Sequence, residues 1–126
     1  RMPFARYIGN HALSLMTRLV TGLDVTDSQC GYIAITREAA ARLPLDRLWP
    51  RYGYPNDLLG ELALAGLRSV DVVVRPIYAD EISGIGVRHA LFVVPYVLLR
   101  VAFRRLANAL VRVDEGDARL ARIKGR

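Results

Sequence analysis

The segment Val70–Arg75 places the strongest constraint on the fold of this chain. Four of its six residues are valines, and such a β-branched run is typical of a strand that is buried on both faces. A second strand is predicted from Tyr32 to Thr36. A two-stranded sheet is only marginally stable in isolation. The sequence therefore predicts an α/β fold whose sheet is incomplete here and is finished by strands from another part of a longer protein.

Helical periodicity is clear in three further segments. From Arg6 to Val20 a polar residue stands at every fourth position and apolar residues line the other side, which predicts an amphipathic helix. The polar positions of this helix are Arg6, Asn10, Ser14 and Arg18. Their side chains are expected either to face solvent or to bind a phosphate. Thr36 is expected to cap a short helix over 37–42, and Asn56 to cap a helix that ends near Gly66.

Composition limits the chain to one folded domain and excludes two kinds of site. The 126 residues are 52% apolar and 24% charged, which allows a packed core. A single cysteine, Cys30, excludes an internal disulfide framework and a multi-cysteine zinc site. With only His11 and His89 present, no metal-ligand spacing can be identified. No metal site is therefore predicted within these residues.

The net charge of +6 is confined to the C-terminal third of the chain. Residues 1–87 contain nine arginines and nine acidic residues, whereas residues 88–126 contain nine basic residues and three acidic ones. A neutral body with a basic, apolar C-terminal segment fits an anionic membrane surface better than nucleic acid. No interleaving of aromatic and basic residues suited to stacking bases is present, so nucleic acid is not an expected partner.

The last helix is predicted to begin near Pro95 and to be strongly amphipathic. Its apolar face comprises Leu98, Leu99, Ala102, Phe103, Leu106, Ala109, Leu110 and Val113. The opposite face carries Arg100, Arg104, Arg105, Asn108 and Arg112. Such a helix lies in a membrane interface, or alternatively packs on its own domain with the arginines in water. Three regions are thus expected: a domain over 1–87, a membrane-interface helix over 88–113 and a frayed polar tail over 114–126.

A polar loop between the first helix and the following strand is the first candidate for a functional site. Asp27, Ser28 and Gln29 can hydrogen-bond nearby backbone, and Gly31 allows backbone dihedrals closed to other residues. Loops at strand ends commonly deliver side chains to a site, although an ordinary Asx-type turn explains the same residues. Asp57, at the start of a predicted helix, likewise either serves a site or only stabilises the helix dipole.

Four motifs occur in order between residues 2 and 86. They are Met2-Pro3 with Arg6, Gly9 and Asn10; Thr26 to Tyr32; Tyr52 to Leu59; and Val74 to Tyr78 with Glu81, Ser83 and Gly84. Together they resemble the C-terminal half of bacterial family-2 glycosyltransferases, in particular the dolichol-phosphate mannosyltransferase-like and polyprenyl-phosphate glycosyltransferase-like enzymes. The resemblance implies an A-type glycosyltransferase fold, which is Rossmann-like, with residues 1–87 as its acceptor-side half.

The resemblance also implies ligands for an N-terminal half of the enzyme that is not contained in this chain. In this family the N-terminal half binds a nucleotide sugar and a divalent metal, Mg²⁺ or Mn²⁺, through an Asp-x-Asp motif. No two aspartates stand two positions apart in this chain. The metal ligands and the donor site are therefore expected mostly in that other half, in keeping with an N-terminal Arg1 that reads as the interior of a longer protein. The chain alone is predicted to transfer little or no sugar.

Individual roles follow from the resemblance, residue by residue. Catalytic roles fall to Asp27, near the donor sugar, and to Asp57, which in relatives acts as the base that deprotonates an acceptor hydroxyl. If the acceptor is a lipid phosphate, it is already an anion, and Asp57 instead orients groups or metal. The residues expected to bind substrate are Gln29, Tyr32, Asn56, Arg75, Ser83 and Arg6. Ile33 and Gly84 depart from the pattern, because lipid-phosphate members usually carry Arg and Lys there.

These features predict an inverting glycosyltransferase that works at the cytoplasmic side of the cell membrane. Its donor is expected to be a nucleotide sugar, and its acceptor a polyprenyl phosphate or another lipid-linked group. The alternative is a non-catalytic module that docks on membranes through residues 90–113.

Overall fold

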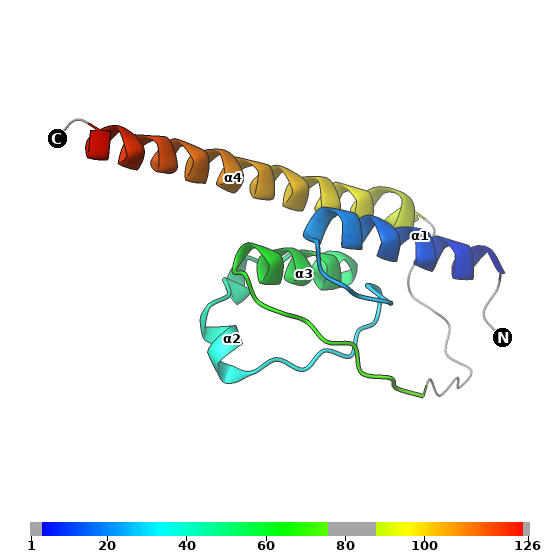
Figure 1. The fold of residues 1–126 in the computed structure, drawn as a ribbon. Coiled ribbons are helices and arrows are strands. Elements are labelled where there is room, and N and C mark those ends of the chain that lie inside the picture. Colours follow the sequence, from blue (N-terminus) through cyan, green and yellow to red (C-terminus); the bar gives the residue numbers. More distant parts are fainter. Residues whose placement is uncertain (1–3, 76–87, 125–126) are drawn as a thin grey trace.

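We describe the protein from a computed structural model, in which residues 4–75 and 88–124 are placed. Its elements in chain order are α1 (Phe4–Thr21), α2 (Arg37–Ala41), the short 3₁₀ helices η1 (Leu45–Arg47) and η2 (Arg51–Gly53), α3 (Tyr54–Leu64), the π-helical turn η3 (His89–Val93) and α4 (Val94–Lys124). The long α4 packs against both α1 and α3, and the loops and α2 lie on the side away from α4 (Figure 1).

The structure corrects the predicted α/β fold. Among the described residues there is no strand, so the chain is helical, and neither a Rossmann-like A-type glycosyltransferase fold nor an incomplete sheet is present. Both predicted strands, 32–36 and 70–75, run as extended backbone without ladder partners. Val73, in the middle of the second segment, is 97% exposed. A β-branched run favours extended backbone, but a strand also requires a neighbour that pairs with its N–H and C=O groups.

The helices largely follow the predicted periodicity. The hydroxyl of Thr36 accepts a hydrogen bond from the Ala39 N–H at 3.2 Å and thereby caps α2 as expected. Helix α3 ends before Gly66, whose φ of +68° suits a helix exit. Its start was predicted wrongly, because α3 begins at Tyr54 and Asn56 therefore lies inside the first turn rather than at the cap.

Helix α4 is longer than predicted. It continues without interruption to Lys124, so the segment expected to be a frayed tail is helical up to that residue. The reason is local, because residues 118–122 are Ala-Arg-Leu-Ala-Arg, all of which have high helix propensity. The C-terminal part of α4 projects beyond the other helices (Figure 1).

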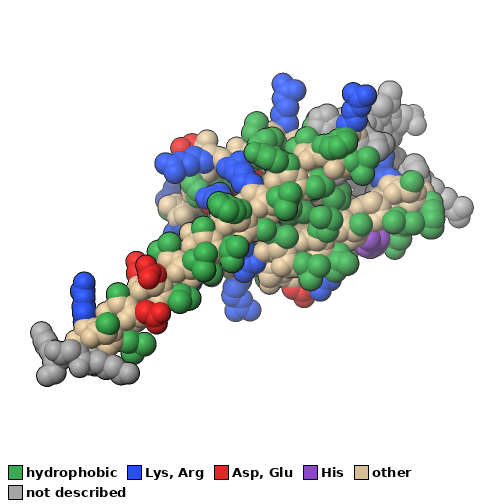
Figure 2. Space-filling view, turned by 90° about the horizontal axis from the view of Figure 1, so that it is seen from above, with side chains coloured by type: hydrophobic (Ala, Val, Ile, Leu, Met, Phe, Trp, Pro, Cys, Tyr) green, Lys and Arg blue, Asp and Glu red, His purple; other side chains and the backbone are tan. Residues whose placement is uncertain are grey.

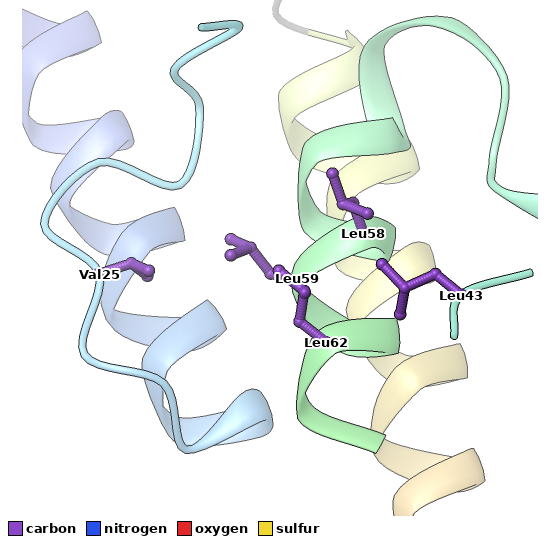
Figure 3. Packing of buried hydrophobic residues seen from close by; sticks show 5 residues of the cluster. All are labelled: Val25, Leu43, Leu58, Leu59 and Leu62. Carbon is purple, nitrogen blue, oxygen red and sulfur yellow. The ribbon is translucent and has the colours of Figure 1, made fainter. Parts of the chain in front are cut away.

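Two small apolar clusters hold the helices together. One joins α3 to the loops, and its buried members are Val25, Leu43, Leu58, Leu59 and Leu62 (Figure 3). The other lies along α4, where Val94, Val97, Leu98 and Val101 are buried. Gly60 allows the close approach of α3 and α4, because a Cβ atom there would stand 2.5 Å from Cγ2 of Val101.

Substituting this glycine tests the packing of α3 on α4. Gly60→Ala is expected to lower the free energy of unfolding by about 1–3 kcal/mol, since overpacking outweighs the gain in helix propensity. Gly116→Ala is the matched control, because no atom lies within 4 Å of its Cβ position, and it should stabilise the protein by about 1 kcal/mol. Urea denaturation measures both changes. Equal stabilisation by the two substitutions would show that α4 does not pack on Gly60.

Candidate functional site

A buried polar junction lies at the start of α3. Asn56 and Asp57 are both completely removed from solvent, between α1 and α4. The Oδ1 atom of Asn56 accepts hydrogen bonds from the hydroxyl of Thr17 on α1, at 2.9 Å, and from the side-chain amide of Gln29, at 3.3 Å. One amide thus connects three parts of the chain: α1, the loop after it and α3.

Asp57 connects two further parts. Its Oδ2 atom accepts a hydrogen bond from the backbone N–H of Trp49 at 2.8 Å, and the Arg100 guanidinium of α4 lies 3.9 Å from the same oxygen. A buried carboxylate needs such compensation because its hydration has been lost. Asp57 Oδ1 and Asn56 Nδ2 have no hydrogen-bond partner among the described residues. The junction therefore retains one acceptor and one donor that are not used.

The loop after α1 is fixed to that helix by its own polar side chains. The N–H of Ser28 donates to Oγ of Ser14 at 3.0 Å, and both serines are buried. Asp27 Oδ1 accepts from the N–H of Gln29 at 2.9 Å and from the side-chain amide of Asn10 at 3.1 Å. The loop therefore forms the Asx-type turn considered above. Asn10 and Ser14 of the polar stripe on α1 face this loop, rather than solvent or a phosphate.

A cavity of about 520 Å³ opens beside the junction. It is lined by Gln29, Gly31, Arg51, Tyr52, Tyr54 and Pro55, and most of this lining is apolar. The Tyr54 hydroxyl donates to the Gly31 carbonyl at 3.1 Å and so connects the two walls. Arg51 has a φ of +60°, an uncommon left-handed conformation for a residue with a side chain, and such strain is often found at binding sites. Its exposed guanidinium has no carboxylate partner among the described residues.

The structure brings together only part of the predicted site. Gln29, Asn56 and Asp57 meet in the junction, and Asp27 lies next to Gln29. The other predicted substrate-binding residues are not gathered there. Arg6 is exposed near the start of α1, Tyr32 is 88% exposed, and Arg75 is exposed at the end of the extended segment 67–75. Ser83 lies outside the described residues.

Several residues of the site were not anticipated from the sequence. They are Thr17, Trp49, Arg51 and Arg100, whereas Ser14 was considered only as part of the polar stripe on α1. Thr17 carried no signal, because a threonine within a helix is usually unremarkable. Arg100 was expected on a membrane-facing or solvated arginine face, whereas it approaches a buried carboxylate. The charge of Asp57 was the available signal, since a buried acid requires a nearby cation.

The two acids in and beside the junction, Asp57 and Asp27, can take part in different chemistry. Asp27 is exposed and can meet a ligand directly, whereas Asp57 is sealed inside the protein. No group of three or more His, Cys, Asp or Glu side chains that could hold a metal ion occurs in the part of the chain that the structure describes.

Comparisons with known proteins give little further information. No protein-family model matches the chain, and no solved structure matches it. It is 34% identical, over 79 residues, to an uncharacterized protein of Methanocaldococcus jannaschii. The matched region covers 63% of this chain and 32% of that relative, so it spans about a third of the relative's length.

Proposed function

We propose that the chain forms the acceptor-binding part of a family-2 glycosyltransferase, and that the acceptor is a phosphate carried on an apolar chain. The observation that supports this proposal is the cavity beside the junction, which combines an apolar lining with one cation, Arg51. The family assignment rests on the four sequence motifs described above. Two of them, Thr26 to Tyr32 and Tyr52 to Leu59, contribute residues to the cavity and the junction.

The composition of the cavity matches a lipid phosphate. The rings of Tyr52 and Tyr54, with Pro55, offer a surface for an isoprenoid chain or for the face of a sugar. A guanidinium binds phosphate through a planar fork of N–H donors. Gln29 adds a polar group at the wall shared with the junction, where its amide already donates to Asn56. Arg51 therefore takes the phosphate, and the aromatic wall takes the adjoining apolar portion.

Burial of Asp57 favours the same acceptor class. A general base must come within hydrogen-bond distance of the proton that it removes. Asp57 is 0% exposed and its carboxylate is bound to Trp49 and Arg100, so it serves as a positioning residue that holds the loop between η1 and η2, and α4, against α3. A phosphate oxygen is already anionic and needs no base. The exposed Asp27 is left as the acid that lies near the transferred sugar.

The nucleotide-sugar donor and the divalent metal belong to this proposal only as partners of the complete protein. The relative from Methanocaldococcus jannaschii is about three times as long as the region that it shares with this chain. The greater length of the relative leaves room for a donor-binding part.

Binding of farnesyl phosphate, a short lipid phosphate, tests the proposed acceptor site. The chain should bind it saturably in isothermal titration, and Arg51→Gly should weaken binding at least about tenfold through loss of a charge-assisted contact. Because glycine adopts positive φ without strain, this substitution should leave the free energy of unfolding unchanged or raise it by up to about 1 kcal/mol. Loss of binding can then be separated from loss of folding.

Two controls accompany the titration. Arg68→Ala removes an exposed arginine that does not line the cavity, and it should leave the affinity unchanged. Farnesol, which lacks the phosphate, should bind at least about tenfold more weakly than farnesyl phosphate. Equal affinity for the two ligands, or equal affinity of the wild-type chain and Arg51→Gly, would contradict the assignment of Arg51 to a phosphate.

A double-mutant cycle tests the positioning role of Asp57. Asp57→Asn keeps an acceptor for the Trp49 N–H but leaves Arg100 without its counter-charge, and it should lower the free energy of unfolding by about 1–3 kcal/mol. Arg100→Gln should cost less in the Asp57→Asn background than in the wild type, by about 1 kcal/mol, because Arg100 is partly exposed. Additive losses in urea denaturation would mean that the two residues are not coupled.

A further inference from the structure

Only the first part of α4 is fixed to the body of the protein. Arg104 pairs with Glu61 of α3, and Arg105 donates to the carbonyl of Val20. The apolar side chains of α4 that are buried there are Val94, Val97, Leu98 and Val101. From 108 to 123 every residue is exposed, and this part of α4 projects beyond the other helices (Figure 1). A helix without tertiary contacts is only marginally stable in water, so the projecting part lacks a packing partner.

A second apolar side of α4 is exposed and runs along its whole length, which we call the heptad stripe. It consists of the positions from 96 to 124 that are spaced alternately three and four residues apart. Only two of these positions are polar, Asp117 and Lys124. The apolar members are each at least 55% exposed, and they are Tyr96, Leu99, Phe103, Leu106, Leu110, Val113 and Leu120. This spacing is the pattern by which one helix packs along another in a coiled coil.

The body leaves the heptad stripe free, because the buried side chains of α4 fall on the opposite side of the helix. In Figure 2 hydrophobic side chains follow α4 on the face that is shown. A shallow groove of about 620 Å³ lies on the exposed side, with Tyr96, Phe103 and Leu106 in its lining. None of the described helices is both long enough and apolar enough to cross a membrane. The groove is open to side chains from another helix.

The period of the heptad stripe favours a helical partner over a flat one. A straight helix drifts by about 20° per heptad relative to a strict seven-residue repeat. A stripe that keeps this repeat from 96 to 124 therefore stays in contact only with a helix that winds around it. A flat bilayer would lose contact along the stripe and would also receive the carboxylate of Asp117, which lies within it.

The charges on the stripe select the direction in which a second α4 packs. In a parallel pair Asp117 and Lys124 would each face the same residue of the partner, and like charges in contact cost free energy. In an antiparallel pair that covers the whole stripe, Tyr96 faces the partner's Leu120 and Asp117 faces the partner's Leu99. The antiparallel direction therefore removes both repulsions.

The two flanks of the stripe fit the same arrangement. On one flank Asp114 lies opposite the partner's Arg100, and by symmetry Arg100 lies opposite the partner's Asp114. The Arg100 side chain is 33% exposed, so it can meet this second carboxylate while it remains 3.9 Å from Asp57. The other flank consists of small residues at heptad spacing, which let two helices approach closely: Ala102, Ala109 and Gly116.

We propose that the heptad stripe of α4 packs antiparallel against α4 of a second copy of this chain, forming a two-helix coiled coil. Burial of a large apolar side chain removes on the order of 100 Å² from water, so the apolar members of both stripes bury roughly 1,400 Å². Stable interfaces bury about 1,200–2,000 Å². The two bodies then lie at opposite ends of the coiled coil, because each is fixed to the first part of its own α4. This inference goes beyond the proposed function and does not depend on it.

Analytical ultracentrifugation of the full chain tests the dimer. The wild-type chain should sediment as a dimer, and Leu110→Gln should raise the dissociation constant at least about a hundredfold, because each dimer loses two buried leucines. Val111→Gln is the matched control. It changes the neighbouring residue, which is equally exposed but lies outside the stripe, and it should leave the dissociation constant unchanged.

A charge reversal and a cross-link test the direction of the helices. Asp114→Arg places two arginines opposite each other and should weaken the dimer at least about tenfold, whereas Glu115→Arg, on the side away from the partner, should not. In a Cys30→Ser background, Ala109→Cys should be joined to its partner by a short bismaleimide, because Ala109 lies opposite the partner's Ala109. Leu120→Cys should not be joined, since the two copies of that residue lie about 36 Å apart along the axis.

The substituted residues of α4 are all exposed, so the fold should be retained, and circular dichroism checks this. The inference is overturned by a wild-type monomer at about 100 μM, by a dimer that Leu110→Gln leaves intact, or by cross-linking through Leu120→Cys and not through Ala109→Cys. It is also overturned if the chain is monomeric and Leu110→Gln instead lowers its sedimentation with phosphatidylglycerol vesicles, because a bilayer would then cover the stripe.

Discussion

The structure depends on the enclosure of one amide and one carboxylate, Asn56 and Asp57, at the start of α3. Burying such groups without partners costs several kcal/mol, so each element around them must supply a donor or a charge. Thr17, Gln29 and Trp49 supply the hydrogen bonds, and Arg100 supplies the charge. The apolar clusters are small. The polar junction therefore determines which face of α1 turns inward, whereas the buried side of α4 is apolar.

The exposed apolar side of α1 follows from this constraint. Because α1 contributes Thr17 and Ser14 to buried hydrogen bonds, its apolar side chains are left on the outside. Helix α4 turns Val94, Val97, Leu98 and Val101 inward, beside Arg100 and Arg104, whereas Leu99, Phe103 and Leu106 stay exposed. A folded chain with so much exposed apolar surface requires a covering partner.

The sequence predicted the helices well because helix formation depends on neighbours three and four residues away. The 3.6-residue periodicity of α1, the cap at Thr36 and the exit at Gly66 are all local signals. The two strands were predicted wrongly because their formation depends on partners distant in the sequence. Val70–Arg75 has the composition of a buried strand, yet its side chains are exposed.

The candidate site could be predicted only in part for the same reason. Gln29, Asn56 and Asp57 belong to motifs that can be recognised within short segments. Which arginine would meet Asp57 could not be predicted, because Arg100 lies far along the chain and an amphipathic pattern does not reveal which face turns inward. The strained backbone of Arg51 also had no sequence signal, since a backbone position with positive φ is in general expected to be a glycine.

Native-state hydrogen exchange at the Trp49 amide tests most directly whether the buried junction organises the protein. This N–H donates to Asp57, although Trp49 itself lies in a loop without regular structure. If the junction holds the helices together, the amide opens only when the whole protein unfolds, and its free energy of exchange equals that of the central amides of α3. Exchange at the rate of the other loop amides would contradict the account, because the carboxylate would then not be fixed in the interior.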